Sequence, residues 1–363
     1  MMEKYLAPLL AAALWLSAAA SCSNPTPAAD AAAKEAEPAG IQPTPSEVKP
    51  AAPGPSPCPA PPTDKQKKIF LGSPEEPPAK ERLDEGHYVH SNEQKPQLFF
   101  PYIRGLGEGY VGVGSDQNYT LAAQARSDWV WLMDYDVVIN RLHRVMHAFT
   151  LASDDAAGYL ALWSKKRSGD AVAILEKTYA GDGDLENLVK VYKKFRKEVD
   201  DYNALTMERA AKGKSAFWLH DPGSYDYIRA LLEAGRIRAV QGNLLESTTL
   251  RGIGAAASAL GTRIRVIYIS DAELFFDYTA AFRENFASLP ADESSVVLRT
   301  FSGRVIDVSR GDFQWHYNIE SLLHFIQLLK DPASRNYHSV LKQIEETDVK
   351  GVSTIGLVAG KQE

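Results

Sequence analysis

The chain lacks the features that would assign it to several common protein classes. Only two of its 363 residues are cysteines, Cys22 and Cys58, so no disulfide framework is expected, and no Cys/His group has the spacing of a metal site. The net charge is −6 with both signs mixed, which argues against a nucleic-acid partner because such proteins carry a basic face. The full phosphate-loop pattern Gly-x-x-x-x-Gly-Lys-Ser/Thr and the Gly-x-Ser-x-Gly motif of hydrolases are also absent.

A short apolar segment stands at the N-terminus. Residues 5–20 follow Lys4 and are too few and too rich in alanine for a membrane-spanning helix, but they fit the apolar part of a secretory signal. Ala19-Ala20-Ser21-Cys22 resembles the lipobox of bacterial lipoproteins, whose cysteine carries lipid. We therefore predict a signal peptide over 1–22 and a bacterial cell-envelope protein held to the membrane by a lipid on Cys22, at the outer membrane or the periplasmic face. An ordinary cleaved signal and a cytoplasmic protein are the alternatives.

Residues 23–81 are dominated by Pro, Ala, Glu, Lys and Ser. Such a composition buries too little apolar surface to offset chain entropy, and proline within 50–62 blocks regular helix and sheet. We predict a disordered tether over 23–81 that holds a folded domain, 82–363, away from a membrane surface.

Short apolar runs rich in β-branched residues predict the strands of that domain. They are Gly109–Val113, Trp129–Met133, Ile237–Gln241, Ile264–Ile269 and Ser295–Thr300, with a sixth at either Gln314–Tyr317 or Thr354–Val358. Helical patterns separate most of them, so an α/β fold is expected, with a doubly wound, mostly parallel sheet and helices on both faces.

Helices are predicted at Leu250–Leu260 and at Glu273–Leu289, where Pro290 ends the second one. Residues 137–235 read as a helical insertion between the second and third strands. Its clearest element carries an apolar stripe with steps of three and four between Leu185 and Tyr202, and Asp182 or Asp184 is placed to cap it.

The most informative stretch is 110–136, which reads as strand, glycine turn, helix, strand and acid. Gly112-x-Gly114 ends the first strand, where glycine permits a tight turn and close backbone approach to a ligand. Asp134 follows Gly114 by 20 residues, the interval at which such folds place a carboxylate that binds ribose hydroxyls. Gln117 stands where a dinucleotide fingerprint needs its third glycine, so the pattern favours a nucleoside over a pyrophosphate ligand.

Residues 110–120 resemble motif I of Rossmann-like S-adenosylmethionine-dependent methyltransferases, and Asp134 resembles their ribose-binding acid. Val240-Gln241-Gly242-Asn243-Leu244 resembles their third-strand motif, with Asn243 in place of the commoner Asp near the adenine. The resemblance implies S-adenosylmethionine as cofactor. The residues it implies as the cofactor site are Gly112, Gly114, Asp116, Asn118, Asp134 and Asn243.

The chain is closer still to an uncharacterised bacterial group with methyltransferase-like folds, over about residues 87–301. The shared segments are Ser91-Asn92-Glu93, Gly112 to Asn118, Asn140 with His143, Tyr268 to Glu273, and Leu289 to Ser294. In this resemblance Ser91–Glu93 closes over the ligand. Two departures stand out: Tyr110-Val111 replaces the usual acid before motif I, and 270–273 lacks the Asp/Asn-Pro-Pro-aromatic motif, which disfavours methylation of nucleic-acid bases.

Ser270, Asp271 and Glu273 follow the fourth predicted strand, at the edge where open α/β sheets bind ligands. They are the candidate catalytic residues, with Asp271 or Glu273 as general base for a hydroxyl or an amine. A plain helix cap formed by the same residues is the structural alternative.

Two functional hypotheses follow. The first is a membrane-tethered, methyltransferase-like protein that binds S-adenosylmethionine or a related nucleoside and transfers a methyl group to oxygen or nitrogen. The second is an exported, non-catalytic binding or envelope lipoprotein built on a methyltransferase scaffold. They compete because an exported protein lies outside the compartment that normally supplies this cofactor.

Overall fold

The computed structural model describes residues 59–79, 86–303, 305–306 and 314–357, which all belong to one compact unit. The predicted signal peptide, Cys22, Cys58 and the tether up to residue 58 lie outside the described residues. Within the described ranges, no helix combines the length and the apolar character needed to cross a bilayer.

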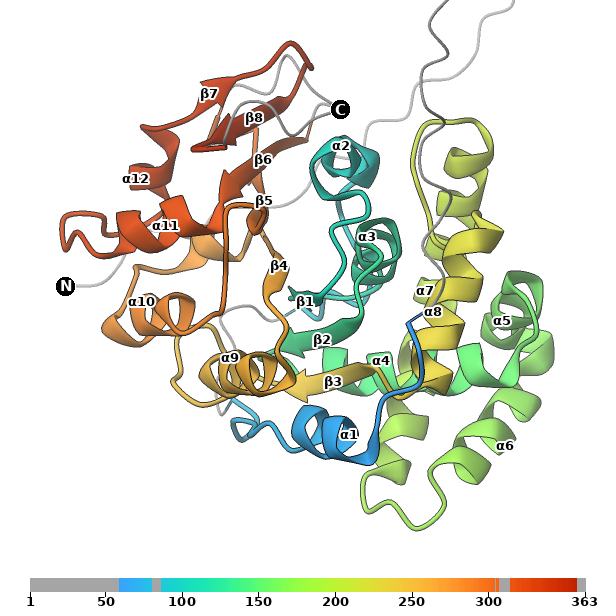
Figure 1. Ribbon diagram of the computed structural model, residues 1–363. Coiled ribbons are helices and arrows are strands. Elements are labelled where there is room, and N and C mark those ends of the chain that lie inside the picture. The colour runs from blue at the N-terminus through green and yellow to red at the C-terminus, as the bar shows by residue number, and fades with distance from the viewer. Residues whose placement is uncertain (1–58, 80–85, 304, 307–313, 358–363) are drawn as a thin grey trace, which may run out of the picture. The chain divides into compact units, whose positions relative to one another are not determined.

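The described unit is built on an eight-stranded sheet in the order β3-β2-β1-β4-β5-β6-β8-β7 (Figure 1). Strands β1 to β5 all pair in parallel, β6 is antiparallel to β5, β8 is parallel to β6, and β7 is antiparallel to β8. This confirms a mixed α/β fold with a mostly parallel sheet, and both candidates for the sixth strand prove to be strands. The bounds are β1 Gly109–Gly112, β2 Trp129–Asp134, β3 Ile237–Gln241, β4 Ile264–Ser270, β5 Val296–Ser302, β6 Trp315–Ser321, β7 Glu345–Glu346 and β8 Val352–Ile355.

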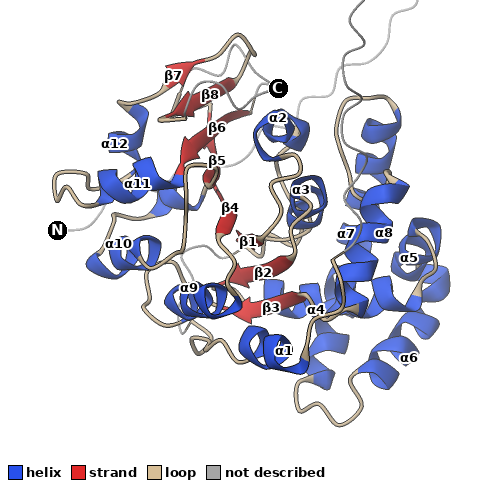
Figure 2. Cartoon of the chain, in the orientation of Figure 1, coloured by secondary structure: helices blue, strands red, loops and turns tan. Residues whose placement is uncertain are grey.

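Helices lie on both faces of the sheet (Figure 2). The two faces carry separate apolar clusters: in β1, Tyr110 belongs to one and its neighbour Val111 to the other, because successive side chains of a strand point to opposite faces. The helices are α1 Asp64–Leu71, η1 Pro96–Phe99, α2 Phe100–Ile103, α3 Gln117–Ala125, α4 Val137–Ala152, α5 Ala156–Trp163, η2 Lys165–Arg167, α6 Ser168–Thr178, α7 Leu185–Ala211, α8 Pro222–Glu233, α9 Thr249–Leu260, η3 Ala272–Phe275, α10 Ala280–Ala287, α11 Leu322–Leu329 and α12 Tyr337–Leu341.

Between β2 and β3 the chain consists only of helices, α4 to α8, and their connections. The stripe expected on α7 is buried at Leu188, Tyr192 and Val199, so it packs into the core. Asp184 occupies the N-cap position but accepts from the guanidinium of Arg141 instead of a helix N–H. That this segment is an insertion between the second and third strands of a Rossmann-like fold stays a prediction.

The tripeptide Gly213-Lys214-Ser215 follows α7 and forms its C-terminal turn. Gly213 has φ of 65°, and the Lys214 N–H donates to the carbonyl of Arg209. Since Glu208 stands where a phosphate loop needs its first glycine, this turn is not a phosphate-binding loop.

The long helix expected at Glu273–Leu289 is wrong. The chain forms the short η3, becomes extended at Phe276, and begins again as α10. The break follows from Thr279, whose hydroxyl accepts from the Phe282 N–H and caps α10. It also follows from Tyr278, whose ring is buried and whose hydroxyl donates to Glu273.

Residues 59–79, which composition assigned to the tether, are instead part of the folded unit. Thr63 and Gln66 form a capping box that starts α1, and Phe70 is fully buried against Trp129 and Trp131. The carboxylate of Glu76 accepts from backbone N–H groups at the start of α9. We call residues 59–79 the N-terminal arm; it corrects the expected start of the fold near residue 82.

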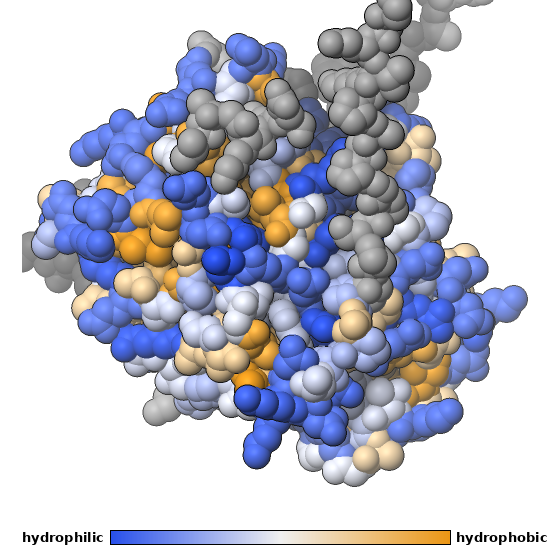
Figure 3. All heavy atoms as spheres, viewed as in Figure 1, coloured by the Kyte–Doolittle hydropathy of each residue, from blue (hydrophilic) through white to orange (hydrophobic). Residues whose placement is uncertain are grey.

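The molecular face seen in Figure 1 is mostly hydrophilic, with hydrophobic residues in small separate groups (Figure 3). Scattered apolar residues of this kind are normal on the surface of a folded domain. The feature that stands out in the described unit is a concave one, at the carboxyl ends of the parallel strands.

Candidate functional site

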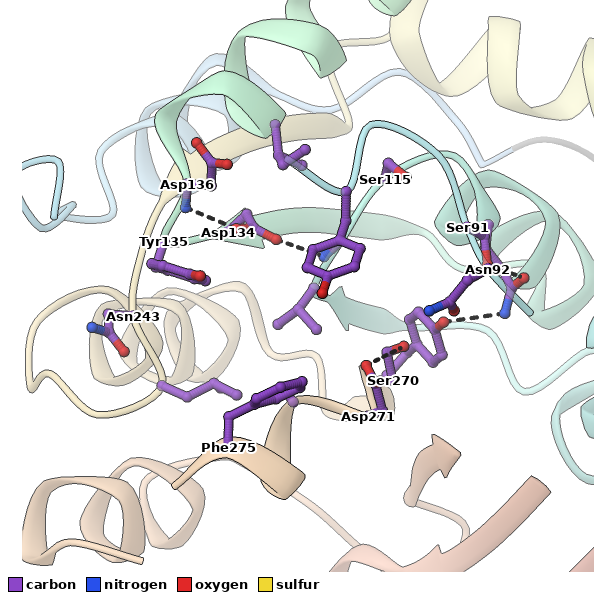
Figure 4. A pocket seen from close by; sticks show the side chains of 18 of the residues that line it. Ser91, Asn92, Ser115, Asp134, Tyr135, Asp136, Asn243, Ser270, Asp271 and Phe275 are labelled. Carbon is purple, nitrogen blue, oxygen red and sulfur yellow. Dashed lines mark hydrogen bonds between the residues drawn. The ribbon is translucent and has the colours of Figure 1, made fainter. Parts of the chain in front are cut away.

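A cleft of about 230 Å³ opens at the carboxyl ends of β1, β2, β3 and β4 (Figure 4). This is the edge at which open α/β sheets bind ligands, and the volume suits a small molecule better than a macromolecule. It is lined by Gly86, Tyr88, His90, Ser91, Asn92, Val113, Gly114, Ser115, Gln117, Asp134, Tyr135, Asp136, Ile139, Gly242, Asn243, Leu244, Leu245, Tyr268, Ser270, Asp271, Ala272, Phe275 and Phe276.

The glycine turn and the acid predicted to work together do meet in this cleft. Gly114 has φ of 79°, a value that only glycine adopts freely. Its N–H donates to the Asp134 Oδ2 over 2.9 Å, and the Asp136 N–H donates to Oδ1 over 2.8 Å. The carboxylate of Asp134 is thereby fixed beside the turn at the end of β2, and the space next to the pair remains open.

Burial raises the pKa of Asp134 to about 7, although the two backbone N–H groups act in the opposite direction. Asp136 adds to the rise because a second negative charge lies close by. Asp134 therefore loses its proton near neutral pH, and the strength of its interaction with a ligand depends on pH in that range.

His143 stabilises the turn from behind. Its Nε2 lies 2.9 Å from the carbonyl oxygen of Gly114 and its Nδ1 lies 2.8 Å from the hydroxyl of Tyr119. A carbonyl only accepts, so Nε2 carries the proton and Nδ1 accepts from Tyr119. Burial lowers the pKa of His143 to about 4, which keeps the ring neutral. The role of His143, which the sequence left open, is to hold the turn.

Three predicted cofactor-binding residues lie behind the cleft instead of lining it. Asn118 is fully buried and donates from Nδ2 to the carbonyls of Val113, Gly114 and Ser115. Gly112 is needed for this packing, because a Cβ there would meet the Asn118 Oδ1 at 1.8 Å. Asp116 accepts from the Ser91 N–H over 3.0 Å. Their contacts shape the turn, and Gln117 is the neighbour that lines the cleft.

Asn243 lines the cleft on the side of β3, on a loop that the N-terminal arm holds. Its Oδ1 accepts from the Leu245 N–H over 2.9 Å, and its own N–H donates to the Glu76 Oε2 over 3.2 Å. The Glu76 Oε1 accepts from the N–H groups of Thr248 and Thr249 over 2.6 and 2.7 Å. A carboxylate here is favoured by the positive end of α9, so the arm fixes this wall of the cleft.

The opposite wall is organised around Glu93, which is buried. Its Oε1 accepts from the hydroxyls of Ser270 over 2.9 Å and Thr300 over 2.6 Å. Its Oε2 accepts from the Tyr268 hydroxyl over 2.7 Å and from the amide of Gln117. Burial raises the pKa of Glu93 to about 7. In the segment Ser91-Asn92-Glu93, which the resemblance predicts to close over the ligand, Ser91 and Asn92 line the cleft. Glu93 holds the segment in place through its hydrogen bonds to β4 and β5.

Of the three predicted catalytic residues, Ser270 and Asp271 line the cleft and Glu273 does not. Ser270 has φ of 51°, a strained conformation for a residue with a side chain. Burial raises the pKa of Asp271. Glu273 instead points away, to Arg299, whose Nε lies 2.6 Å from its Oε2, and to the Tyr278 hydroxyl at 2.5 Å.

Sequence reasoning missed several lining residues. Tyr88 and Tyr135 add aromatic surface, and Asp136 adds a second acid next to Asp134. Asp136 was detectable, because it directly precedes α4 and its side chain accepts from the Val138 N–H as an N-cap. The position of Tyr88 depends on long-range contacts around it, such as that between His87 and Asp136 at 2.6 Å, which no local pattern predicts.

The lining is acidic. Asp134, Asp136 and Asp271 contribute carboxylates, and none of the described residues that line the cleft is Lys or Arg. Among the described residues, no group of three or more His, Cys, Asp or Glu side chains is placed to hold a metal ion. An anionic ligand would find no counter-charge in the lining, whereas a cationic one would.

One family model covers most of the chain. A profile described as domain of unknown function (DUF7790) matches residues 88–356. The chain belongs to this family. The matched region includes the sheet from β1 through β8 and every lining residue of the cleft except Gly86, and it leaves the N-terminal arm outside. No curated protein matches the chain.

Proposed function

We propose that the protein is a membrane-tethered, methyltransferase-like protein whose Rossmann-like domain binds S-adenosylmethionine or a related nucleoside. The reaction would be methyl transfer to an oxygen or nitrogen of an acceptor. The strand order β3-β2-β1-β4-β5 with parallel pairing supports the fold part of this proposal, since nucleosides bind where such an order reverses direction, beside β1.

The observation that carries the proposal is the 2.9 Å contact between the Gly114 N–H and Asp134, beside an open cleft. A carboxylate oxygen has two lone pairs, so Asp134 can still accept from ribose hydroxyls while it holds the turn. In the proposed complex Gly114 approaches the ligand, Asn243 lies near the adenine, and Tyr135 and Leu244 offer apolar surface to the base. Methyl transfer would then depend mainly on alignment of donor and acceptor.

The charge of the lining supports this ligand over other adenine compounds. S-adenosylmethionine carries a positive sulfonium and no phosphate. The lining offers three carboxylates and, among its described residues, no Lys or Arg. Phosphate recognition normally uses arginine, lysine or a cluster of N–H groups, so ATP and NAD would bind poorly.

A second candidate, the non-catalytic binding lipoprotein, is favoured by one observation. Both oxygens of Asp134 already accept backbone N–H groups, so the carboxylate has a structural role without any ligand. Together with the predicted export, this is what a retained scaffold that has lost its reaction would have. Its ligand would be a neutral or cationic small molecule held in the same cleft.

Calorimetry on the full-length chain tests the first proposal. We expect S-adenosylmethionine and S-adenosylhomocysteine to bind at micromolar concentrations, and ATP and NAD to bind at least tenfold more weakly. No heat from either S-adenosyl compound at millimolar concentration would remove the methyltransferase proposal and leave the second candidate. Metabolic labelling with palmitate tests the location: an unlabelled protein that keeps residues 1–22 would overturn the tether.

A further inference from the structure

The cleft has a second half that the proposed nucleoside contacts leave unassigned. Figure 4 shows Ser270 and Asp271 on the other side of the pocket from Tyr135 and Asn243. This half is formed by the end of β4 and by η3, and Phe275 and Phe276 add aromatic rings to its lining. Phe275 is 53% exposed, so much of its ring surface is accessible to a ligand in the cleft.

Asp271 is the acid of this half, and its protein partners are weak. The hydroxyl of Ser270 lies 3.5 Å from its Oδ1, and the backbone N–H of Asp271 itself is the other donor. The same hydroxyl lies 2.9 Å from Glu93 and has one proton to give, so it donates to Glu93 at the shorter distance. Glu93 therefore keeps Ser270 away from Asp271, and the carboxylate of Asp271 retains its accepting capacity toward the cleft.

We propose that this half of the cleft is an acceptor subsite for an amine with an apolar body, in which Asp271 pairs with the amino group and receives its proton. Asp271 is half-buried, and a carboxylate partly withdrawn from water is stabilised when a cation pairs with it; an ammonium group supplies that cation. The rings of Phe275 and Phe276 suit the apolar body and attract a nearby cation through their faces. As a methyl acceptor, the amine rests on the function proposed above; as a ligand, it does not.

The transfer step balances as follows. The ammonium gives one proton to the Asp271 carboxylate, which exposes the nitrogen lone pair. That pair attacks the sulfonium methyl carbon, a new N–C bond forms, the S–C bond breaks, and its electron pair stays on sulfur as the neutral thioether. The product is a methylated ammonium, and Asp271 later releases its proton to water. Because burial raises the pKa of Asp271, it accepts this proton more readily than an exposed aspartate.

Three ligands with one common body test the subsite on the full-length chain with S-adenosylhomocysteine present. Phenethylamine, 2-phenylethanol and phenylacetate differ only in the group that meets Asp271. By calorimetry we expect the amine to bind at least tenfold more tightly than the alcohol, and phenylacetate not to bind. Asp271→Asn should remove the preference for the amine, while Asp277→Asn, at an exposed carboxylate six residues away, should leave it unchanged.

The proposal is overturned if none of the three ligands binds at millimolar concentration, if amine and alcohol bind alike, or if Asp271→Asn keeps the preference. Binding of S-adenosylmethionine is measured separately, so the two proposals can fail independently. An Asp271-dependent amine preference without S-adenosylmethionine binding supports the amine subsite and removes the methyl donor. Tritium transferred from labelled S-adenosylmethionine to phenethylamine supports both.

Discussion

Asp271 and Glu273 stand two residues apart in the chain, yet they belong to different kinds of buried site. Glu273 is 2% exposed and pairs with Arg299, which also pairs with Glu320; all three side chains are enclosed between the sheet and the helices α10 and α11. Asp271 faces a cleft, and the charged group placed near it is another acid, Glu93, on the far side of the Ser270 hydroxyl.

The difference lies in what compensates each carboxylate. In the cluster of Glu273, Arg299 and Glu320, the protein supplies the cation itself, so the charges are already matched and the site is structural. In the cleft, Asp271 and Asp134 are compensated by neutral donors only, and a cationic ligand would complete them. An acid that lines the cleft and has no cation paired with it is therefore the better marker of a functional site in this fold.

The largest expected effect comes from removal of the internal cation. Arg299→Met removes the guanidinium that pairs with both Glu273 and Glu320 and leaves the two buried carboxylates together, with the Tyr278 hydroxyl and the partly exposed His324 as their remaining partners. We expect it to lower the free energy of unfolding by about 3–5 kcal/mol. Denaturant unfolding measures this. Arg263→Met, which breaks a half-exposed pair with Glu108 and Asp292, should cost less than about 1 kcal/mol. If the two variants lowered the free energy of unfolding equally, the buried cluster of Glu273, Arg299 and Glu320 would be no more important for stability than a half-exposed ion pair, and its assignment as a structural site would fail.

Asp271→Asn provides the other side of the comparison. Because burial raises the pKa of Asp271 and no internal cation depends on it, a neutral amide should leave the free energy of unfolding within about 1 kcal/mol of the parent or raise it slightly. A loss as large as that of Arg299→Met would mean that Asp271 is structural, and the cleft assignment would fall.

Asp134→Asn should act on ligand binding. A hydrogen bond to a charged group is worth about 1.5–3 kcal/mol, so the affinity for S-adenosylmethionine should fall by roughly tenfold or more by calorimetry. The amide keeps one acceptor oxygen for the two backbone N–H groups that Asp134 binds, so the free energy of unfolding should also fall, by about 1–3 kcal/mol. An unchanged affinity would show that the ligand does not use this carboxylate.

The pH dependence of binding should follow Asp134, whose pKa burial raises to about 7. Above that pH the carboxylate is ionised and accepts hydrogen bonds from ribose hydroxyls more strongly, so affinity should rise several-fold between about pH 6 and 8, and Asp134→Asn should flatten the profile. The stability of the free protein has the opposite sign. The folded state holds the Asp134 proton to higher pH than the unfolded state, so this contribution is present in acid and lost as the pH rises through 7.

The smallest effect is expected at the edge of the ion-paired cluster. His324 lies 2.7 Å from the Glu320 Oε1 and is partly exposed, and its pKa is raised by that carboxylate. His324→Gln should lower the free energy of unfolding by less than about 1 kcal/mol. A raised histidine pKa stabilises the fold below the ordinary value and loses that effect as the pH rises, so the difference should be visible at pH 5.5 and absent at pH 9.

The parts of the fold that could be predicted were those with strong local patterns. β-branched apolar runs identified β1 to β5 within a residue or two, and the alanine-rich run identified α9. The expectation of one long helix at 273–289 failed because its apolar pattern ignored Tyr278 and Thr279, whose burial and capping depend on partners elsewhere in the chain. The N-terminal arm was not predicted because the composition of 23–81 as a whole is typical of a disordered segment. Phe70 becomes buried through contacts with Trp129 and Trp131, which lie far from it in the sequence.

The candidate site divides in the same way. Chain order and the properties of the parallel sheet bring Gly114 to Asp134, because strands that run side by side end at one edge, and the 20-residue interval spans one helix and one strand. No local sequence pattern shows that Asp271 lines the cleft while Glu273 does not. The same is true of Gln117, which lines the cleft, and its neighbour Asn118, which is fully buried behind it.

The sequence by itself determined the alternation of strands and helices, the turn at Gly114 and the acid at the end of β2, since each depends on the backbone preferences of nearby residues. Only the tertiary structure decided which acids face a ligand. Arg299, on β5, pairs with Glu273, and Glu93, from a segment far away in the sequence, accepts the hydrogen bond of Ser270. Whether an acid has a counter-charge depends on residues that are distant in the chain and close in space, so no short stretch of sequence can show it.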